Sequence, residues 1–214
     1  MRNELESIGI STALILVNVG IMAAIAVTPV ADLVLALFST LILGVIVYGA
    51  LLSGGTYLAE RGVKQEELGL AGVGIALLQL GYGSFGGAIL SLVPPGTFGP
   101  ALAVTAVVTT AIAAGAAALV YGTGRDFSSF RRYATYLFLG VLLTALVGTF
   151  TPPVAVLAFV LALLGFLFLL VYEIWETRKA PDRVLLNGLG IYNAFMGVFV
   201  HILRIVVQMY LQRE

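Results

Sequence analysis

The sequence predicts an all-α membrane protein with seven transmembrane helices in a single domain. Of its 214 residues, 60% are hydrophobic and only 10% are charged, a composition typical of integral membrane proteins. The mean hydropathy of +1.08 agrees with this class. Seven apolar stretches are long enough to cross a bilayer, and the basic residues fall between alternate stretches.

A spanning helix needs about 20 mostly apolar residues, and prolines separate several of the stretches that reach this length. The expected spans are residues 8–27, 33–53, 68–93, 101–121, 133–150, 154–175 and 184–211. The first is interpreted as a retained span, because two acids precede it and it is about twice as long as the apolar part of a signal peptide. No linker leads to a second domain, so residues 1–214 are expected to form one domain.

The basic residues predict the orientation, because cytoplasmic loops retain Lys and Arg. Those that precede the first span or lie in loops of the same side are Arg2, Arg61, Lys64, Arg125, Arg131, Arg132, Arg178, Lys179 and Arg183. The loops of the other side contain none, and Arg213 follows the last span. We therefore expect a cytoplasmic N-terminus and an external C-terminus.

The residue types that are absent exclude several kinds of chemistry. The chain has no cysteine and a single histidine, so disulfides, thiolate nucleophiles and zinc sites built on several histidines are excluded. Eleven basic and eleven acidic residues balance, which gives no indication of a nucleic-acid partner. We expect neither a cofactor nor an enzymatic activity.

Two spans are expected to lie inside the helix bundle. The third span, residues 68–93, is rich in glycine, and Gly83 and Gly87 have the small-xxx-small spacing that lets helix backbones approach closely. The fourth span, residues 101–121, is built from Ala, Val and Thr and is also expected to be internal. Its threonines are expected to bond their own backbone.

The last span, Val184–Leu211, carries strongly polar groups within an apolar run. Small and polar residues recur every three or four positions on one helix face, which we call the polar stripe: Asn187, Gly190, Ala194, Gly197, His201, Arg204 and Gln208. The opposite face is apolar, at Leu185, Leu189, Phe195, Phe199, Ile202 and Ile205. The pattern predicts that the stripe is turned toward protein or water, and that this helix is the functional centre.

Two short motifs resemble those of a known family. The loop between the fourth and fifth spans contains Thr123, Asp126, Phe127 and Ser128. It resembles the T-x-x-D-F/L-S loop of the Bax inhibitor-1 (TMBIM) family. In the last span, the run from Ile191 through Tyr192, continuing to Ile202-Leu203-Arg204, is similar to that family's L-Y-x-D-x-I/F and L-L-R signature. Tyr172 and Glu173 occupy the place of its Tyr-Asp.

The resemblance implies a prokaryotic seven-helix member in the plasma membrane, with six helices wrapped around the seventh. It also implies a pH-sensitive calcium leak. In the family, an acid on the sixth helix and one on the seventh are thought to share a proton and close the pore. Here Glu173 supplies the first acid, whereas Ala194 stands where the second is expected, beside Asn193.

Glu173 is the main candidate for ion binding. At about 1.5 Å per residue it lies roughly 28 Å along the sixth span, near the inner membrane boundary. It is expected to bind a cation such as Ca²⁺ transiently at an inner gate. Glu176 lies one turn further out, and repulsion between the two acids lets one of them exchange a proton near neutral pH. The alternative is an interfacial acid beside Arg178 and Lys179.

Three polar residues of the last span have two interpretations each. Asn193 lies near mid-membrane and either bonds a neighbouring helix or lines an ion path. His201 is either a packed core histidine or a proton sensor. Arg204 lies near the outer boundary, where it either snorkels to lipid headgroups or anchors the helix.

Two other functions remain open at this point. One is a non-conducting membrane scaffold that acts through unidentified protein partners. The other is an intramembrane serine protease, in which Ser84 and His201 would act as nucleophile and base on separate spans.

Overall fold

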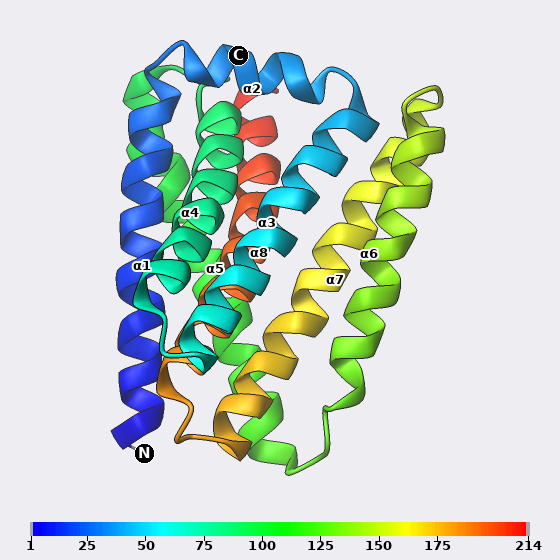
Figure 1. The fold of residues 1–214 in the computed structure, drawn as a ribbon. Helices are drawn as coiled ribbons and strands as arrows, with labels where there is room; N and C mark the ends of the chain where they lie inside the picture. The colour runs from blue at the N-terminus through cyan, green and yellow to red at the C-terminus, as the bar shows by residue number, and fades with distance from the viewer. Residues whose placement is uncertain (1, 213–214) are drawn as a thin grey trace.

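The computed structural model describes residues 2–212, with the side chain of Pro153 left undescribed, and within this range the chain forms helices and no strand. The helices are α1 (Arg2–Ala26), α2 (Val30–Phe38), α3 (Leu41–Lys64), α4 (Leu68–Leu90), η1 (Pro95–Thr97), α5 (Phe98–Thr123), α6 (Ser129–Gly148), α7 (Pro152–Lys179) and α8 (Val184–Leu211). Seven of the helical segments are long and apolar enough to cross a membrane. The first residues of α1 and the last residues of α8 lie at opposite ends of the bundle (Figure 1). The predicted fold class is confirmed.

The second span differs from its prediction. Residues 33–53 do not form one helix, because α2 ends at Phe38 and lies across the end of the bundle (Figure 1). Thr40 adopts an extended backbone, and the membrane-spanning helix is α3, Leu41–Lys64. Ion pairing between Lys64 and Glu60 at 2.9 Å supports the last turns of α3, so this helix continues past the apolar run. The prediction was wrong because neither proline nor glycine marks the break.

Two helices, α4 and α8, occupy the interior. Among the 18 most apolar consecutive residues of each helix, 61% are buried within the protein, compared with 11–22% in the other five spans. The helix α8 packs against α1, α3, α4, α5 and α7, whereas α6 packs on α7 and α3 and lies further out. The structure therefore confirms the central place predicted for the C-terminal helix and adds α4 beside it.

Glycines bring α4 close to its neighbours on two sides. A Cβ added at Gly87 would lie 2.8 Å from Ile25 of α1, and one added at Gly74 would meet the backbone of Ala59 on α3. These contacts confirm that residues 68–93 contribute an inner helix. Only a residue without a side chain permits such an approach of two backbones.

The helix α5 is on the outside of the bundle, so its predicted internal position was wrong. Thr105 and Thr109 are buried on the side that faces the bundle, but Thr110 and most other residues are exposed. A surface of Ala and Val suits contact with lipid tails as well as contact with protein, which is why composition misled here. The Thr105 hydroxyl donates to the carbonyl oxygen of Ala101 at 2.7 Å, as predicted, whereas the buried Thr109 hydroxyl has no hydrogen-bond partner among the described residues.

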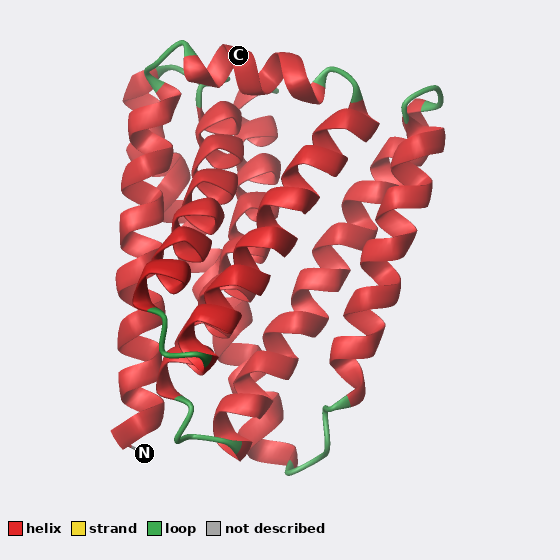
Figure 2. Ribbon diagram, viewed as in Figure 1, coloured by secondary structure: helices red, strands yellow, loops and turns green. Residues whose placement is uncertain are grey.

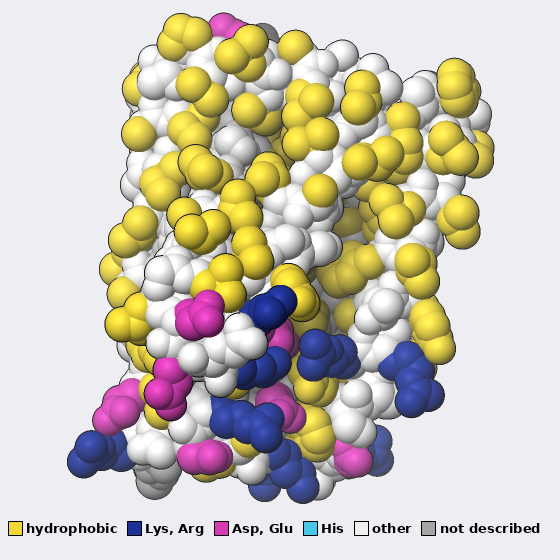
Figure 3. All heavy atoms as spheres, in the orientation of Figure 1, with side chains coloured by type: hydrophobic (Ala, Val, Ile, Leu, Met, Phe, Trp, Pro, Cys, Tyr) yellow, Lys and Arg dark blue, Asp and Glu magenta, His cyan; other side chains and the backbone are white. Residues whose placement is uncertain are grey.

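The outer surface separates apolar and charged regions. Short loops join most of the helices at the two ends of the bundle (Figure 2). In Figure 3, hydrophobic side chains cover most of the visible face, and Lys, Arg, Asp and Glu side chains gather at the end that carries the N-terminus. All nine basic residues predicted to share one side belong to helix ends or loops at this end. We call it the charged end; Arg213 lies outside the described residues.

Candidate functional site

From Asn187 to His201 the polar stripe of α8 is turned toward protein, as predicted, whereas Arg204 and Gln208 at its far end are exposed. Near the charged end, the side-chain amide of Asn187 donates to the carbonyl oxygen of Ala180 at 2.8 Å. One turn further along α8, a Cβ added at Gly190 would collide with the carboxylate of Glu173. Gly190 therefore provides the space that the Glu173 side chain occupies.

The same interface continues toward the opposite end of the bundle. A Cβ at Gly197 would collide with the ring of Phe166. The His201 ring lies 5.0 Å from that of Phe159 and 5.6 Å from that of Phe166, between centroids, and its Nδ1 contacts the carbonyl oxygen of Gly197 at 2.7 Å. The guanidinium of Arg204 lies 5.0 Å above the Phe159 ring. These contacts favour packing roles for His201 and Arg204.

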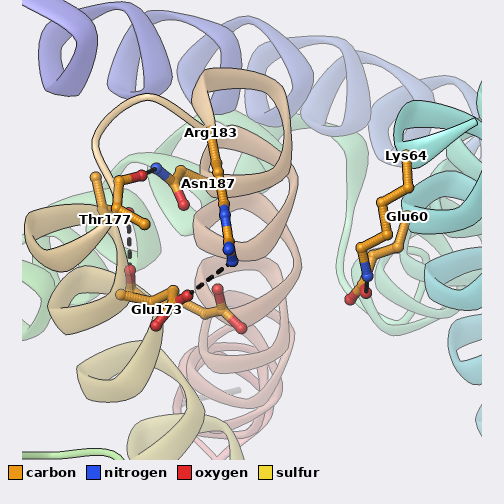
Figure 4. Close-up of polar contacts among 8 residues, drawn as sticks. Glu60, Lys64, Glu173, Thr177, Arg183 and Asn187 are labelled. Atoms are coloured by element: carbon orange, nitrogen blue, oxygen red, sulfur yellow. Dashed lines mark hydrogen bonds and ion pairs between the residues drawn. The ribbon is translucent and has the colours of Figure 1, made fainter. Parts of the chain in front are cut away.

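Three other charged residues lie near the carboxylate of Glu173. Arg131 of α6, Glu60 of α3 and Glu176 of α7 are close enough to interact with its carboxylate electrostatically. We call these four residues the Glu173 site. Figure 4 shows Glu173 in front of α8, with Glu60 on the helix across from it. Neither Glu60 nor Arg131 was singled out from the sequence, because nothing local indicates that α3, α6 and α7 converge.

Glu173 differs from the other two acids of the site in its partners. Glu60 pairs with Lys64, and Glu176 pairs with Arg183 at 3.4 Å between nitrogen and oxygen (Figure 4). Within residues 2–212 the Glu173 carboxylate has no hydrogen bond and no ion pair. A carboxylate inside a membrane-spanning helix without a fixed partner remains free to bind a proton or a cation.

Asn193 bonds a neighbouring helix, which is the first of its two interpretations. The hydroxyl of Tyr82 on α4 donates to the Asn193 side-chain oxygen at 2.7 Å and lies 2.8 Å from its main-chain oxygen. The ring of Tyr48 on α3 meets that of Tyr82 edge to face, and the ring of Phe85 lies 4.8 Å from that of Tyr48. Phe38, at the end of α2, contacts both of these rings. These rings fill the interior beyond the Glu173 site.

A second buried polar cluster was missed from the sequence. The side-chain amide of Asn18 on α1 donates to Gln79 of α4, at 2.6 Å to the side-chain oxygen, and lies 3.1 Å from the hydroxyl of Tyr192. The Gln79 amide donates in turn to Leu14 at 3.0 Å. Asn18 and Gln79 were visible as amides within apolar stretches, and polar residues in spans usually face the protein interior. The cluster places the motif residue Tyr192 against α1, where it is fully buried.

The other motif residues build the turn between α5 and α6. The Thr123 hydroxyl donates to the carbonyl oxygen of Leu119 at 2.7 Å, and Phe127 is buried. The Ser128 amide donates to Asp126 Oδ1 at 2.8 Å, and this backbone hydrogen bond holds the pKa of Asp126 below its usual value. Gly124 ends α5 in the left-handed conformation, with φ 61°, which favours glycine.

The remaining predicted site residues do not meet at one place. Ala194 is fully buried within α8 and contributes no polar group. The Ser84 hydroxyl donates to its own helix, at 2.5 Å from the Leu80 oxygen, and no hydrogen bond joins it to His201 among the described residues. Within the same residues, no group of three or more His, Asp or Glu is placed to hold a metal ion.

Comparisons of the chain with protein-family models, curated proteins and solved structures gave no match. The fold by itself defines the class: an integral membrane protein of seven long helices, with α4 and α8 in its interior.

Proposed function

We propose that this protein is a pH-sensitive leak for cations, calcium among them, and that Glu173 is the cation ligand at the cytoplasmic end of the path. One observation carries the proposal: the Glu173 carboxylate lies inside a membrane-spanning helix, against Gly190, with no fixed partner among residues 2–212. Ionisable residues at such positions usually mark an ion or proton path, because placing them there costs stability.

The chemistry of the site supports a hard cation. Carboxylate oxygens are the ligands that Ca²⁺ prefers, and Glu173 is the acid of the site that has no ion pair among residues 2–212. Glu60 and Glu176 lie close to it but are paired with Lys64 and Arg183, and Arg131 adds a positive charge. The resemblance to the Bax inhibitor-1 family supports calcium in particular. Loss of a proton from Glu173 would charge the site, so we expect cation flux to rise with pH.

The orientation and the state of the path are part of the proposal. The charged end would face the cytoplasm, because cytoplasmic segments retain Lys and Arg. This would place the N-terminus inside a prokaryotic cell and the C-terminus outside. A cation leaving Glu173 for the other side would have to pass Asn193 and the rings of Tyr48 and Phe85. We infer that the structure corresponds to a closed state, and that these rings move when the path opens.

Calcium flux into liposomes tests the proposal. The full-length protein would be reconstituted into liposomes containing a calcium-sensitive dye, and influx would be recorded at about pH 6, 7 and 8. We expect influx above that of protein-free liposomes, rising with pH, and loss of the pH-dependent part in Glu173→Gln. Glu6→Gln is the matched control, because Glu6 is an acid at the same end that pairs with Arg2 on the surface.

Two results would contradict the proposal. Influx equal to that of protein-free liposomes would favour the alternative, a scaffold that acts through protein partners. Influx that is unchanged in Glu173→Gln would show that the protein leaks calcium but that Glu173 is not part of the path. Size-exclusion profiles of the two variants show whether both are folded.

A further inference from the structure

A basic pocket lies at the charged end, away from the Glu173 site. It has a volume of about 220 Å³ and is lined by Gly124, Arg125, Trp175, Arg178 and Lys179. Since a water molecule occupies about 30 Å³ in the liquid, the pocket has room for on the order of seven waters. A phosphate group with a small organic substituent is of similar size.

Two of the three cations of the pocket, Arg178 and Lys179, are held by contacts to the helices that form it. Arg178 of α7 donates to the carbonyl oxygen of Val120 at 2.7 Å, and its guanidinium lies 5.3 Å above the ring of Tyr121. The Val120 carbonyl belongs to the last turn of α5, where helix carbonyls lack partners, so Arg178 caps that helix. The Lys179 ammonium lies 5.9 Å from the Trp175 ring.

The cations of the pocket form no ion pair with an acid among the described residues. Asp126 attracts Lys179 electrostatically, but its Oδ1 accepts the Ser128 amide of the same loop. Glu176, on the same helix as Arg178, pairs with Arg183. The Tyr121 hydroxyl donates to Glu4 at 3.2 Å. Three cations therefore line one small volume without an ion pair to an acid among the described residues, and an anion is the complementary ligand.

The position of the pocket identifies the source of that anion. The pocket lies at the end of a helix that is long and apolar enough to cross a membrane and that ends at Thr123. The end of such a helix is expected at the depth of the lipid headgroups. Trp175 and the half-exposed Tyr121 are the residues that membrane proteins place at this boundary. A ligand that put a phosphate into the pocket would keep its acyl chains in the bilayer beside α5.

We propose that the pocket formed by Gly124, Arg125, Trp175, Arg178 and Lys179 binds the phosphate of an anionic phospholipid. Arg125 and Lys179 supply charge from either side of the pocket, while Arg178 joins the ligand to the end of α5. A bound lipid would thus connect α5 to α7. This site does not depend on whether the protein conducts cations.

The fluorescence of Trp175 provides a direct test, because it is the only tryptophan in the chain. The full-length protein would be reconstituted into phosphatidylcholine vesicles containing increasing fractions of brominated phosphatidylglycerol, whose bromines quench a neighbouring indole. Brominated phosphatidylcholine at the same fractions measures quenching by bulk lipid. We expect quenching by phosphatidylglycerol to saturate at a lower lipid fraction than quenching by phosphatidylcholine.

Two double variants distinguish lipid binding at the pocket from attraction by the overall charge of the surface. The double variant Arg125→Gln, Lys179→Gln should weaken apparent phosphatidylglycerol affinity about 25-fold, taking each cation near a headgroup as worth about fivefold. The control Arg61→Gln, Arg132→Gln removes two basic residues from the same end outside the pocket and should leave the affinity within about threefold. Arg178 is left intact because it caps α5.

Two outcomes would overturn the proposal. Quenching that rises equally with both lipids, or equally in the two double variants, would show that the pocket has no preference for an anionic headgroup. Inorganic phosphate or glycerol phosphate that displaces the brominated lipid at millimolar concentration would identify a soluble anion as the ligand instead. Because this experiment measures lipid binding and no ion flux, a negative result would not bear on the proposed cation leak.

Discussion

The packing of α3 against α4 allows a quantitative test at Gly74. In Gly74→Ala, the new Cβ would lie 2.6 Å from the Ala59 Cα and 2.6 Å from the Gly55 carbonyl oxygen. Both are backbone atoms, so no side chain can turn away and the two helices must separate. Gly72, on the same helix, has no neighbouring atom within 4 Å of the position that a Cβ would take.

The difference between the two variants isolates the packing contribution. Overpacking of a well-filled interior costs about 1 to 3 kcal/mol, and contact with backbone places Gly74→Ala at about 3 kcal/mol. Alanine in place of glycine also favours a helix by about 1 kcal/mol at either position. We therefore expect Gly74→Ala to lower the free energy of unfolding by about 2 kcal/mol, and Gly72→Ala to raise it by up to about 1 kcal/mol.

Reversible unfolding in mixed micelles, followed by circular dichroism, measures both variants against the wild type. A loss of about 2 kcal/mol corresponds to about a 30-fold smaller ratio of folded to unfolded protein. Gly62→Ala should behave like Gly74→Ala, because its Cβ would lie 2.7 Å from the Ala71 Cα on the facing helix. Equal stability of Gly74→Ala and Gly72→Ala, within about 0.5 kcal/mol, would refute close contact between these helices.

Three further predictions concern polar groups. Tyr82→Phe removes a hydroxyl that donates to Asn193 of α8 and should lower the free energy of unfolding by about 1 kcal/mol. Tyr48→Phe removes a buried hydroxyl that has no partner among the described residues, so it should be neutral or stabilising in the same unfolding assay. Gly190→Ala should displace the flexible Glu173 carboxylate, which changes cation flux in liposomes while unfolding stability shifts by less than about 1 kcal/mol. The pKa of Asp126 is lowered by its hydrogen bonds, so its contribution to stability is present above the ordinary pKa of 3.8 and is lost as pH falls below it. Asp126→Asn should therefore destabilise at neutral pH and approach the wild type as the pH falls through the lowered pKa of Asp126, as measured by unfolding across pH. A difference that is independent of pH would contradict this assignment.

Most of the fold could be predicted because membrane spans are specified locally. An apolar run of sufficient length is both necessary for a span and visible in the sequence, which is why six of the seven predicted spans overlap their helices closely. The exception, residues 33–53, depends on a break at Ser39 and Thr40 that local composition does not reveal. Phe38, before the break, packs against Gly44, after it, and only the folded chain defines this contact.

The site could be predicted only in part, for a related reason. Periodicity along one helix shows which residues share a face, so the polar stripe of α8 was visible. It does not show which helix meets that face. Glu60 and Arg131 approach Glu173 from helices far away in sequence, and the partners of Glu176 and Asn193 were likewise set by helix packing.

The contacts between α7 and α8 repeat every seven residues, and Glu173 occupies one of the repeating positions. Residues seven apart on α7, namely Phe159, Phe166 and Glu173, each meet a position on α8, and those positions, Arg204, Gly197 and Gly190, are also seven apart. A seven-residue period is that of helices that cross at a small left-handed angle, with one side chain inserted at each repeat. Two of the three insertions from α7 are aromatic rings, and the third is a carboxylate. An apolar side chain would fill the space beside Gly190 without the cost of burying an acid, so packing alone does not account for glutamate at this position. The attraction of Arg131 is one reason for an acid there, and the proposed cation path would be a second, which is why the proposed leak rests on Glu173 rather than on the more conspicuous polar residues of α8.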